Sequence, residues 1–237
     1  DEDQADGGAF GLTEQTITLW LQGLFIFSLV WSLGSALPLD HRVRFDAVLR
    51  GLLSGQNPLY TRPESVKLTK NNSLPERLTV YDFMFERKAT GSWVEWSSKL
   101  SVPELGRDDR PEDMIVPTAE TIRISYFLDI YLSHRIPMLI VGQTGTGKSV
   151  LVNRHLVTLP KEVYIPNTLN FSARTSANLT QDIIMSRLDR RRRGVFGPPP
   201  GKQCIVFVDD LNMPAKEVYG AQPPIELLRM WIDHGHW

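Results

Sequence analysis

The 237-residue sequence has little cysteine and little net charge, and each shortage excludes a class of protein. Its one cysteine, Cys204, excludes a disulfide framework and any cysteine-rich zinc site, which fits a reducing, intracellular setting. The 26 Lys and Arg residues nearly balance the 27 Asp and Glu residues, so no global field draws the chain to nucleic acid or to an anionic membrane. The acidic start Asp1-Glu2-Asp3 lacks the basic residues of a secretory signal. A hydrophobic content of 42% excludes wholesale disorder.

One long uncharged stretch leaves a membrane span as an open alternative. Residues 17–37 carry no charge, and a helix of this length would cross the ~30 Å hydrocarbon core of a bilayer. On a helical wheel, however, the polar residues share an arc of ~160° with Leu21, Phe25 and Leu29; these polar residues are Gln15, Thr18, Gln22, Ser28, Ser32 and Ser35. A helix that protein buries on most sides explains this pattern as well as lipid does. Because no second apolar run of that length follows, we favour the buried helix.

The rest of the first half predicts a second helix and a β-hairpin. Residues 40–53 have apolar side chains at helical spacings and are followed by Gly55, so residues 10–55 are expected to form a helical pair. Residues 80–85 alternate aromatic and other side chains, and residues 93–96 follow a turn at Gly91, which predicts a hairpin. Its aromatic side chains could stack on nucleic-acid bases, but packing against a neighbouring core is the more common role.

The second half has the pattern of alternating strands and helices. Thr118 is a candidate N-cap for a helix through Leu132, and the apolar run 137–141 predicts a strand followed by a helix over residues 150–156. Further strands are expected at about residues 163–171 and 204–208, and an amphipathic helix is expected after Pro223-Pro224. The charged, proline-containing residues 103–113 are expected to form an exposed connection to this half.

A glycine-rich motif stands between the first of these strands and its helix. Gly142-Gln143-Thr144-Gly145-Thr146-Gly147-Lys148-Ser149 is a full G-x-x-x-x-G-K-[ST] match, which chance would produce roughly once in a hundred chains of this length. The glycines let backbone N–H groups turn toward phosphate oxygens, and the helix adds its positive N-terminal end. Lys148 would reach the β- and γ-phosphates, and the Ser149 hydroxyl would ligate Mg²⁺. The motif therefore predicts a nucleotide-binding loop.

A carboxylate is expected beside this loop to hold the metal. The strand predicted at residues 204–208 runs into Asp209 and Asp210, at the end of the sheet where ligands of α/β proteins lie. Asp209 would then orient a water molecule bound to Mg²⁺. Cys204 is interpreted as a small apolar residue at the strand start rather than as a nucleophile.

Four longer stretches make the chain resemble one family. They resemble the AAA+ ATPases, and among these the third AAA+ module of axonemal dynein heavy chains: NFSARTS (170–176), GVFGPPPG (194–201), FVDDLNMP (207–214) and YGAQPPIELLR (219–229). The resemblance implies an α/β fold, the large subdomain of a P-loop NTPase with an incomplete parallel sheet, preceded by a helical segment and a β-hairpin connector. Of the family's strand order 5-1-4-3-2, only strands 1 to 3 are recognisable, and the fourth strand, the arginine finger and the helical lid would lie outside these residues.

The resemblance also implies a domain organisation and a set of partners. Residues 1–57 would be the last helices of the preceding AAA+ module, 58–113 a connector, and 114–237 the first part of the large subdomain. The parent protein would be a microtubule-based motor of the cytoplasm, the cytoskeleton and the ciliary axoneme. Its partners would be neighbouring AAA+ modules, dynein intermediate and light chains and microtubules, with no nucleic acid and no membrane.

The residues that match the family's nucleotide site imply ATP or ADP with Mg²⁺ as ligands. Ile115, Val116 and Pro117 would lie against adenine, and the phosphates would lie among Gly142, Gln143, Thr144, Gly145, Thr146, Gly147, Lys148, Ser149 and Val150. Lys148, Asp209 and Asp210 would be catalytic, and Ser149 and Asp209 would hold Mg²⁺, the latter through water.

One residue departs from the usual AAA+ pattern. Most active AAA+ sites have a glutamate where this chain has Asp210, and aspartate is usual there in axonemal relatives at this module. The side chain is one methylene shorter, which sets the carboxylate back by roughly 1 to 1.5 Å, and misplacement on that scale can cost ~10²-fold in rate. We therefore expect tight ATP binding with slow hydrolysis. The alternatives are a nucleotide-binding structural module without hydrolysis and a membrane-anchored P-loop protein.

Three further groups of residues have a functional and a structural interpretation. Arg187 and Arg190–Arg193 could bind a phosphate backbone, but cations before Gly194 are typical of a helix C-terminus, and a salt contact to another module or to the filament is also open. Asp233, His234 and His236 have the composition of a metal site, yet they fit the polar end of a helix. Arg174 could face phosphate from a neighbouring site, and nothing in the sequence places it there.

Overall fold

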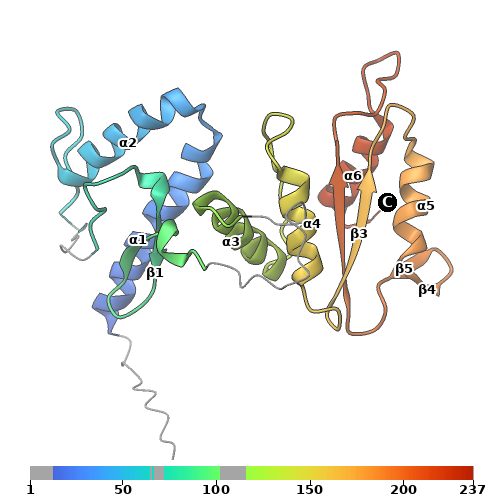
Figure 1. The fold of residues 1–237 in the computed structure, drawn as a ribbon, viewed down its shortest axis with the longest axis horizontal. Coiled ribbons are helices and arrows are strands. Elements are labelled where there is room, and N and C mark those ends of the chain that lie inside the picture. Colours follow the sequence, from blue (N-terminus) through green and yellow to red (C-terminus); the bar gives the residue numbers. More distant parts are fainter. Residues whose placement is uncertain (1–12, 65, 67–71, 102–115, 237) are drawn as a thin grey trace, which may run out of the picture. The chain divides into compact units, whose positions relative to one another are not determined.

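The computed structural model describes residues 13–64, 66, 72–101 and 116–236, and Figure 1 shows its ribbon. The chain divides into two compact units, residues 1–123 and 124–237. The expected site residue Ile115 and the expected connection at 103–113 lie outside the described residues.

The first unit begins with the predicted helical pair. α1 (Glu14–Ser32) starts at Thr13, whose side chain accepts a hydrogen bond from the Thr16 amide at 3.2 Å. A 3-10 turn, η1 (Gly34–Ala36), leads into α2 (Leu39–Ser54), which ends at Gly55 in the left-handed conformation with φ of 75°. The helix boundaries therefore follow the capping signals in the sequence.

α1 buries one face and exposes the other. The buried residues are Leu19, Gly23, Ile26, Phe27 and Val30. The exposed face includes the arc predicted from the helical wheel, with Leu21 62% exposed and Phe25 67% exposed. Protein thus covers this helix on one side within the described residues, whereas burial on most sides was expected. By length and composition alone, Glu14–Ala36 is also long and apolar enough to cross a membrane.

The predicted hairpin is formed by β1 (Phe83–Glu86) and β2 (Ser92–Glu95), which pair antiparallel with Phe85 opposite Trp93. Phe83, Phe85 and Trp96 are at most 3% exposed, and the Trp96 ring lies 6.3 Å from Phe27 of α1. The aromatic side chains therefore form the core of this unit, as the structural interpretation predicted.

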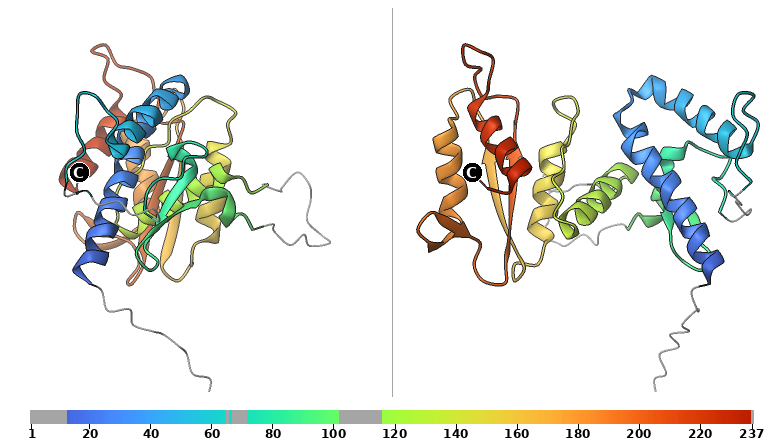
Figure 2. Two further views of the ribbon diagram at one scale, coloured as in Figure 1. Left: turned by 90° about the vertical axis from the view of Figure 1, so that its left-hand side faces the viewer. Right: turned by 180° about the vertical axis from the view of Figure 1, so that it is seen from behind.

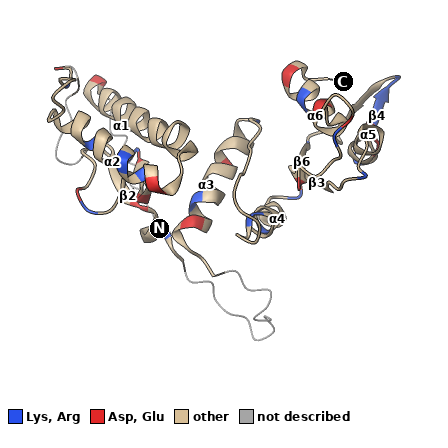
Figure 3. Ribbon diagram, turned by 90° about the horizontal axis from the view of Figure 1, so that it is seen from above, with Lys and Arg blue, Asp and Glu red and all other residues tan. Residues whose placement is uncertain are grey.

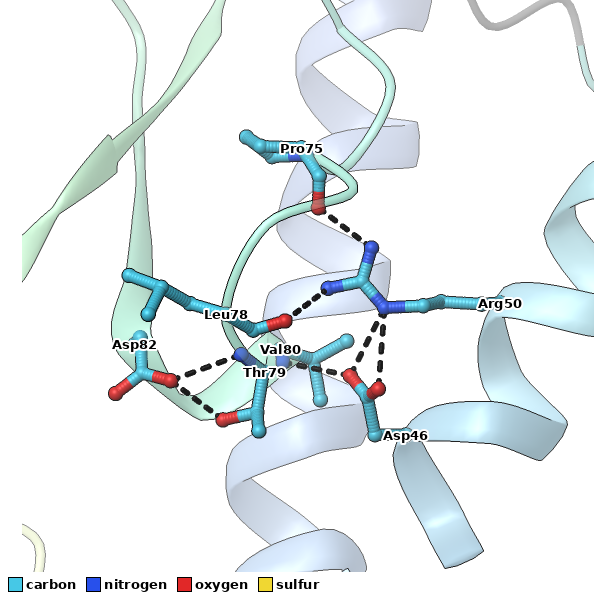
Figure 4. Close-up of polar contacts among 7 residues, drawn as sticks. All are labelled: Asp46, Arg50, Pro75, Leu78, Thr79, Val80 and Asp82. Atoms are coloured by element: carbon cyan, nitrogen blue, oxygen red, sulfur yellow. Dashed lines mark hydrogen bonds and ion pairs between the residues drawn. The ribbon is translucent and has the colours of Figure 1, made fainter. Parts of the chain in front are cut away.

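Residues 80–82 were expected to extend the first strand, but they form a 3-10 turn, η2 (Val80–Asp82). The reason is a polar network around Asp46 and Arg50 of α2, shown in Figure 4. The Asp46 carboxylate accepts hydrogen bonds from the Val80 amide at 2.8 Å and from Arg50 Nε at 3.0 Å. Arg50 also donates to the carbonyl oxygens of Pro75 and Leu78. These contacts draw the chain toward α2 and away from the strand geometry.

The second unit is a parallel α/β arrangement. β3 (Tyr164–Asn170) and β6 (Gln203–Asp209) pair in parallel over seven residues, with Asn170 opposite Asp209. The helices are α3 (Ala119–Ser133), most of which lies in this unit, α4 (Lys148–Thr158), α5 (Ala177–Ser186) and α6 (Pro223–His234). Thr118 is the predicted N-cap, since its Oγ1 accepts a hydrogen bond from the Thr121 amide at 3.2 Å. The two strands and the helix after Pro223-Pro224 also lie where they were predicted.

Helices cover both faces of the strand pair. Ile205 and Phe207 of β6 pack on a cluster with Leu128 of α3 and with Val152 and Leu156 of α4. The alternate residues Val206 and Val208 pack on the opposite cluster, which includes Leu169, Phe171, Ile184 of α5 and Leu228 of α6. β6 is therefore covered by helices on both faces, although each of its seven residues is only half-buried.

Residues 137–141 were expected to form the first strand, and this expectation is wrong for the described residues, where they have no paired strand. Ile140 still packs on the cluster around Leu128 and Val152, whereas Leu139 and Val141 are 70% and 83% exposed. The side chains alternate as in a strand, but no described segment offers backbone partners beside them. In the family order 5-1-4-3-2, the neighbours of strand 1 would be strands 5 and 4.

The arginine run was expected to end a helix, and this expectation is also wrong. α5 ends at Ser186, and Asp189–Arg192 forms β4, which pairs antiparallel with β5 (Val195–Gly197). Gly194 takes φ of 73° in the two-residue turn between them. A glycine at that conformation stops a helix and turns a hairpin equally well, and Val195-Phe196 supplies the strand-forming partner.

Candidate nucleotide-binding site

The glycine-rich loop is exposed from Gly142 to Gly147 and leads directly into α4. Gly145 and Gly147 have φ of 81° and 80°, a region that favours glycine, and open space surrounds the position of a Cβ at each. Backbone conformation, rather than crowding, therefore requires these two glycines. Gly147 caps α4, and its carbonyl oxygen accepts from the Leu151 amide at 3.0 Å.

Lys148 is the first residue of α4, and its side chain folds back over the loop. Its Nζ donates hydrogen bonds to the carbonyl oxygens of Gly142 at 2.9 Å and Gln143 at 2.6 Å. The Thr146 hydroxyl also donates to the Gln143 carbonyl oxygen at 2.9 Å. The ammonium group of Lys148 is thus held by loop carbonyl oxygens at the N-terminus of α4.

The first turn of α4 has the features of an anion-binding helix N-terminus. No side chain caps this helix, and no acidic residue lies in its first turn. Figures 1 and 2 show that α4 begins at the end of the unit where β3 and β6 end. The positive end of the helix and the carboxyl ends of the strands therefore meet at one edge, the usual ligand position in open α/β sheets.

Asp209 and Asp210 lie at that same edge. Asp209 is the last residue of β6, is half-buried, and its Oδ1 accepts from the Asp210 amide at 3.0 Å. Its carbonyl oxygen accepts from the Phe171 amide at 3.0 Å, which fixes the strand end. Asp210 is exposed and has φ of 52°, a left-handed conformation that aspartate adopts at some cost. The two neighbouring carboxylates therefore start from different backbone conformations: that of Asp209 from a strand and that of Asp210 from a left-handed turn.

The remaining expected site residues are placed as follows. Ser149 is half-buried and Val150 is 57% exposed, both in the first turn of α4. Val116 is 70% exposed and Pro117 is half-buried; they precede α3 and belong to the first unit. The second unit thus brings together the loop, Lys148, Ser149, Asp209 and Asp210 at one edge.

Two other groups have structural roles in the described residues. Burial raises the pKa of the Cys204 thiol above its ordinary value, with Arg187 opposing the shift, so the thiol stays protonated and packs as an apolar residue. His234 ends α6 before Gly235, and no group of three metal-ligating side chains occurs among the described residues.

Sequence reasoning missed a pocket of about 380 Å³ beside the start of α5. Arg174 and Lys216 both line it, together with Glu217 and the first turn of α6. Arg174 was singled out from the sequence without a position, and no pattern in the sequence linked it to Lys216. The Ala215 amide donates a hydrogen bond of 3.2 Å to the Ala173 carbonyl oxygen, which joins the two segments that line this pocket.

Two family descriptions match the chain. The P-loop containing dynein motor region matches residues 104–237, and the dynein heavy chain AAA lid domain matches residues 1–98.

Individual proteins match along most of the chain. Human dynein axonemal heavy chain 3 is 59% identical over 229 residues, which is 96% of this chain and 6% of that protein. Mouse dynein axonemal heavy chain 12 is 50% identical over 219 residues, covering 91% of this chain and 7% of that protein. Human dynein axonemal heavy chain 1 is 42% identical over 228 residues, covering 90% of this chain and 5% of that protein. The chain thus spans a small fraction of the relatives it matches.

Proposed function

This chain belongs to the dynein heavy chain family, and from that membership we propose that its glycine-rich loop binds ATP together with Mg²⁺. Nucleotide binding follows from the P-loop motor region that the chain contains. The proposal adds the identity of the nucleotide, the metal and the residues that hold them. The observation that carries it is the position of Lys148, whose ammonium lies against the loop carbonyl oxygens at the N-terminus of α4.

On nucleotide binding, we expect Lys148 to exchange the carbonyl oxygens of Gly142 and Gln143 for phosphate oxygens. The loop amides from Gly145 onward and the uncapped first turn of α4 would bind the same phosphates. These groups position the triphosphate and stabilise its charge, which is most of what phosphoryl transfer requires of a protein. The segment before α3, including Val116 and Pro117, is proposed to lie against adenine.

Ser149 and Asp209 are the proposed metal-binding residues. A hydroxyl and a carboxylate are hard oxygen donors, which suit Mg²⁺. One Asp209 oxygen accepts from the Asp210 amide, so the other remains to hold a metal-bound water. When bound, Mg²⁺ supplies charge neutralisation at the phosphates, and Asp209 fixes where that charge lies.

At the scale of the parent protein, we propose a microtubule-based motor of the axoneme, with this chain as part of its AAA+ region. The names of the relatives support this, since each describes an axonemal dynein heavy chain. Residues 1–57, 58–113 and 114–237 are proposed as the end of one module, a connector and the start of the third module. Neighbouring modules, intermediate and light chains and microtubules are the proposed partners.

A second candidate is a nucleotide-binding module that does not hydrolyse ATP. Two properties of Asp210 favour this second candidate: its exposed position and its left-handed backbone. The direction of the shorter carboxylate is set by a constrained turn and not by a flexible strand end. The two candidates share every binding residue and differ only in the rate of the chemical step.

The proposed function is tested by titrating the 237-residue chain with a fluorescent ATP analogue in the presence of Mg²⁺. Lys148→Ala should weaken binding by at least tenfold, because the ammonium makes charge-assisted contacts with phosphate. Lys161→Ala removes an exposed lysine beyond the far end of α4 and serves as the control. Equal affinity of the parent and Lys148→Ala would rule out this loop as the nucleotide site.

A further inference from the structure

The β4–β5 hairpin concentrates positive charge that the nucleotide site does not use. Residues 187–193 contain five arginines and one acidic residue, Asp189, whereas the whole chain has a net charge of −1. Every residue of β4 is exposed, and Figure 3 shows blue, basic residues gathered along β4 near α5. The hairpin is therefore a local basic surface on a chain that is neutral overall.

The fold does not neutralise these charges. Arg190 stands opposite Phe196 and Arg192 opposite Val195 in the ribbon, so neither faces a carboxylate across the strands. Among the described residues, no ion pair involves Arg190, Arg191, Arg192 or Arg193. Like charges on adjacent positions destabilise a two-stranded ribbon when nothing compensates them.

Within the part of the chain that the structure describes, Arg191 is the one hairpin arginine whose side chain makes a hydrogen bond. Arg191 Nη2 donates to the Pro198 carbonyl oxygen, which fastens the strand to the proline segment after β5. Gly194 in the turn gives the ribbon a defined end. The hairpin thus has a defined backbone structure from which the exposed residues Arg190, Arg192 and Arg193 extend.

We propose that this hairpin is a docking surface for an acidic polypeptide segment, one that presents clustered Asp and Glu carboxylates. Guanidinium groups bind carboxylates through paired, charge-assisted hydrogen bonds. Val195 and Phe196 are 38% and 37% exposed beside the arginines, and arginine with aromatic and apolar contact area is typical of protein interfaces. A nucleic-acid surface would extend the positive field over more of the chain, which the net charge of −1 does not provide.

The test measures binding of a polyglutamate peptide to the 237-residue chain at low and moderate salt. The parent should bind with an affinity that falls as salt rises, and Arg190→Gln/Arg192→Gln should weaken binding by roughly tenfold. Arg44→Gln/Arg135→Gln removes the same charge from exposed positions outside the hairpin and should bind like the parent. Arg191 is left unchanged because of its contact with Pro198.

Thermal unfolding separates a docking role from a structural one. If the arginines serve docking, Arg190→Gln/Arg192→Gln should melt at the parent temperature or above it, since like-charge repulsion is relieved. A lower melting temperature would overturn the proposal, as would unchanged peptide binding by this variant. Tighter binding of a DNA duplex or of anionic lipid vesicles at matched charge concentration would overturn it in favour of those partners.

Discussion

Lys148 and Asp210 are constrained in different ways. Lys148 is a flexible side chain at a helix start, held by two carbonyl oxygens that phosphate oxygens could replace. Asp210 is constrained through its backbone, with φ of 52° directly after the end of β6. The position of Lys148 at the start of α4 followed from the motif alone, and its role in binding phosphate stays a prediction. The conformation of Asp210 could not be predicted, because it depends on how Asp209 ends the strand and on the turn that follows.

A titratable residue outside the site makes a prediction at this scale. A hydrogen bond from Lys99 holds the pKa of the Glu86 carboxyl below its ordinary value of 4.5, with a further contribution from Lys88 and an opposing one from burial. A depressed pKa in the folded state adds stability above the ordinary pKa, and this stability is lost as pH falls through the folded value. The free energy of unfolding, measured with urea, should therefore fall more between about pH 6 and pH 3.5 for the parent than for Glu86→Gln.

The Glu86→Gln variant isolates this residue because glutamine keeps the shape and removes the titration. The effect should be modest, since Lys88 is 79% exposed and solvent screens its charge. Identical pH dependence in the two proteins would show that these ion pairs do not contribute to stability.

The elements divide into those set by local sequence and those set by distant contacts. Helices α1 to α4 and α6 and strands β3 and β6 carry caps, glycine stops or apolar runs that can be read from the sequence, whereas α5 was expected only as a helix that would end in the arginine run. The 3-10 turn at Val80–Asp82 depends on Asp46, 34 residues earlier in the chain, and could not be predicted. The arginine run was assigned to a helix end because cations favour a helix C-terminus and glycine stops a helix, whereas pairing with Val195 and Phe196 decided the outcome.

The contact between α1 and the hairpin gives a prediction for two glycines. A Cβ at Gly23 of α1 would lie 2.2 Å from Cζ of Phe85, which is 3% exposed. Gly23→Ala should therefore destabilise the first unit by about 1–3 kcal/mol, as overpacking of a core does. Gly51→Ala in α2 is the matched control, because nothing lies within 4 Å of its Cβ position and alanine favours a helix by about 1 kcal/mol.

Urea denaturation of both variants, followed by tryptophan fluorescence, measures these changes. The two substitutions should shift the midpoint in opposite directions. A stabilising Gly23→Ala would mean that α1 and the hairpin separate easily enough to admit a methyl group.

At the scale of the whole molecule, the prediction concerns the rate of ATP hydrolysis at the proposed nucleotide site. The resemblance implies that the strand that senses the γ-phosphate and the arginine finger are not among these 237 residues, and the proposed site residues Lys148, Ser149 and Asp209 would then act without those groups. We expect the 237-residue chain to bind Mg·ATP and to hydrolyse it very slowly or not at all. Steady Mg²⁺-dependent turnover that Lys148→Ala abolishes would contradict this expectation.

The full-length heavy chain is the protein in which the proposed role of Asp210 is tested. Asp210→Glu extends the carboxylate by one methylene and should raise single-turnover hydrolysis at this site by up to ~10²-fold if reach limits the reaction. An unchanged rate would show that the length of the side chain at position 210 is not the limit. Absence of single-turnover chemistry in both proteins would favour the module that binds without hydrolysis.

The packing of Phe85 also has a consequence for internal motion. Its ring lies between the Cα atoms of Gly23 and Gly91, where added methyl carbons would fall 2.2 and 2.4 Å from ring atoms, and the Trp93 ring closes the site at 5.2 Å between centroids. A benzene ring needs free volume to rotate by 180°, and a close-packed core provides it only when neighbouring elements move apart. The ring-flip rate of Phe85, measured by NMR line shapes, should therefore report how often the hairpin separates transiently from α1. Slow flips with two resolved ortho-proton signals are expected, whereas a single averaged signal at low temperature would indicate that these elements separate frequently.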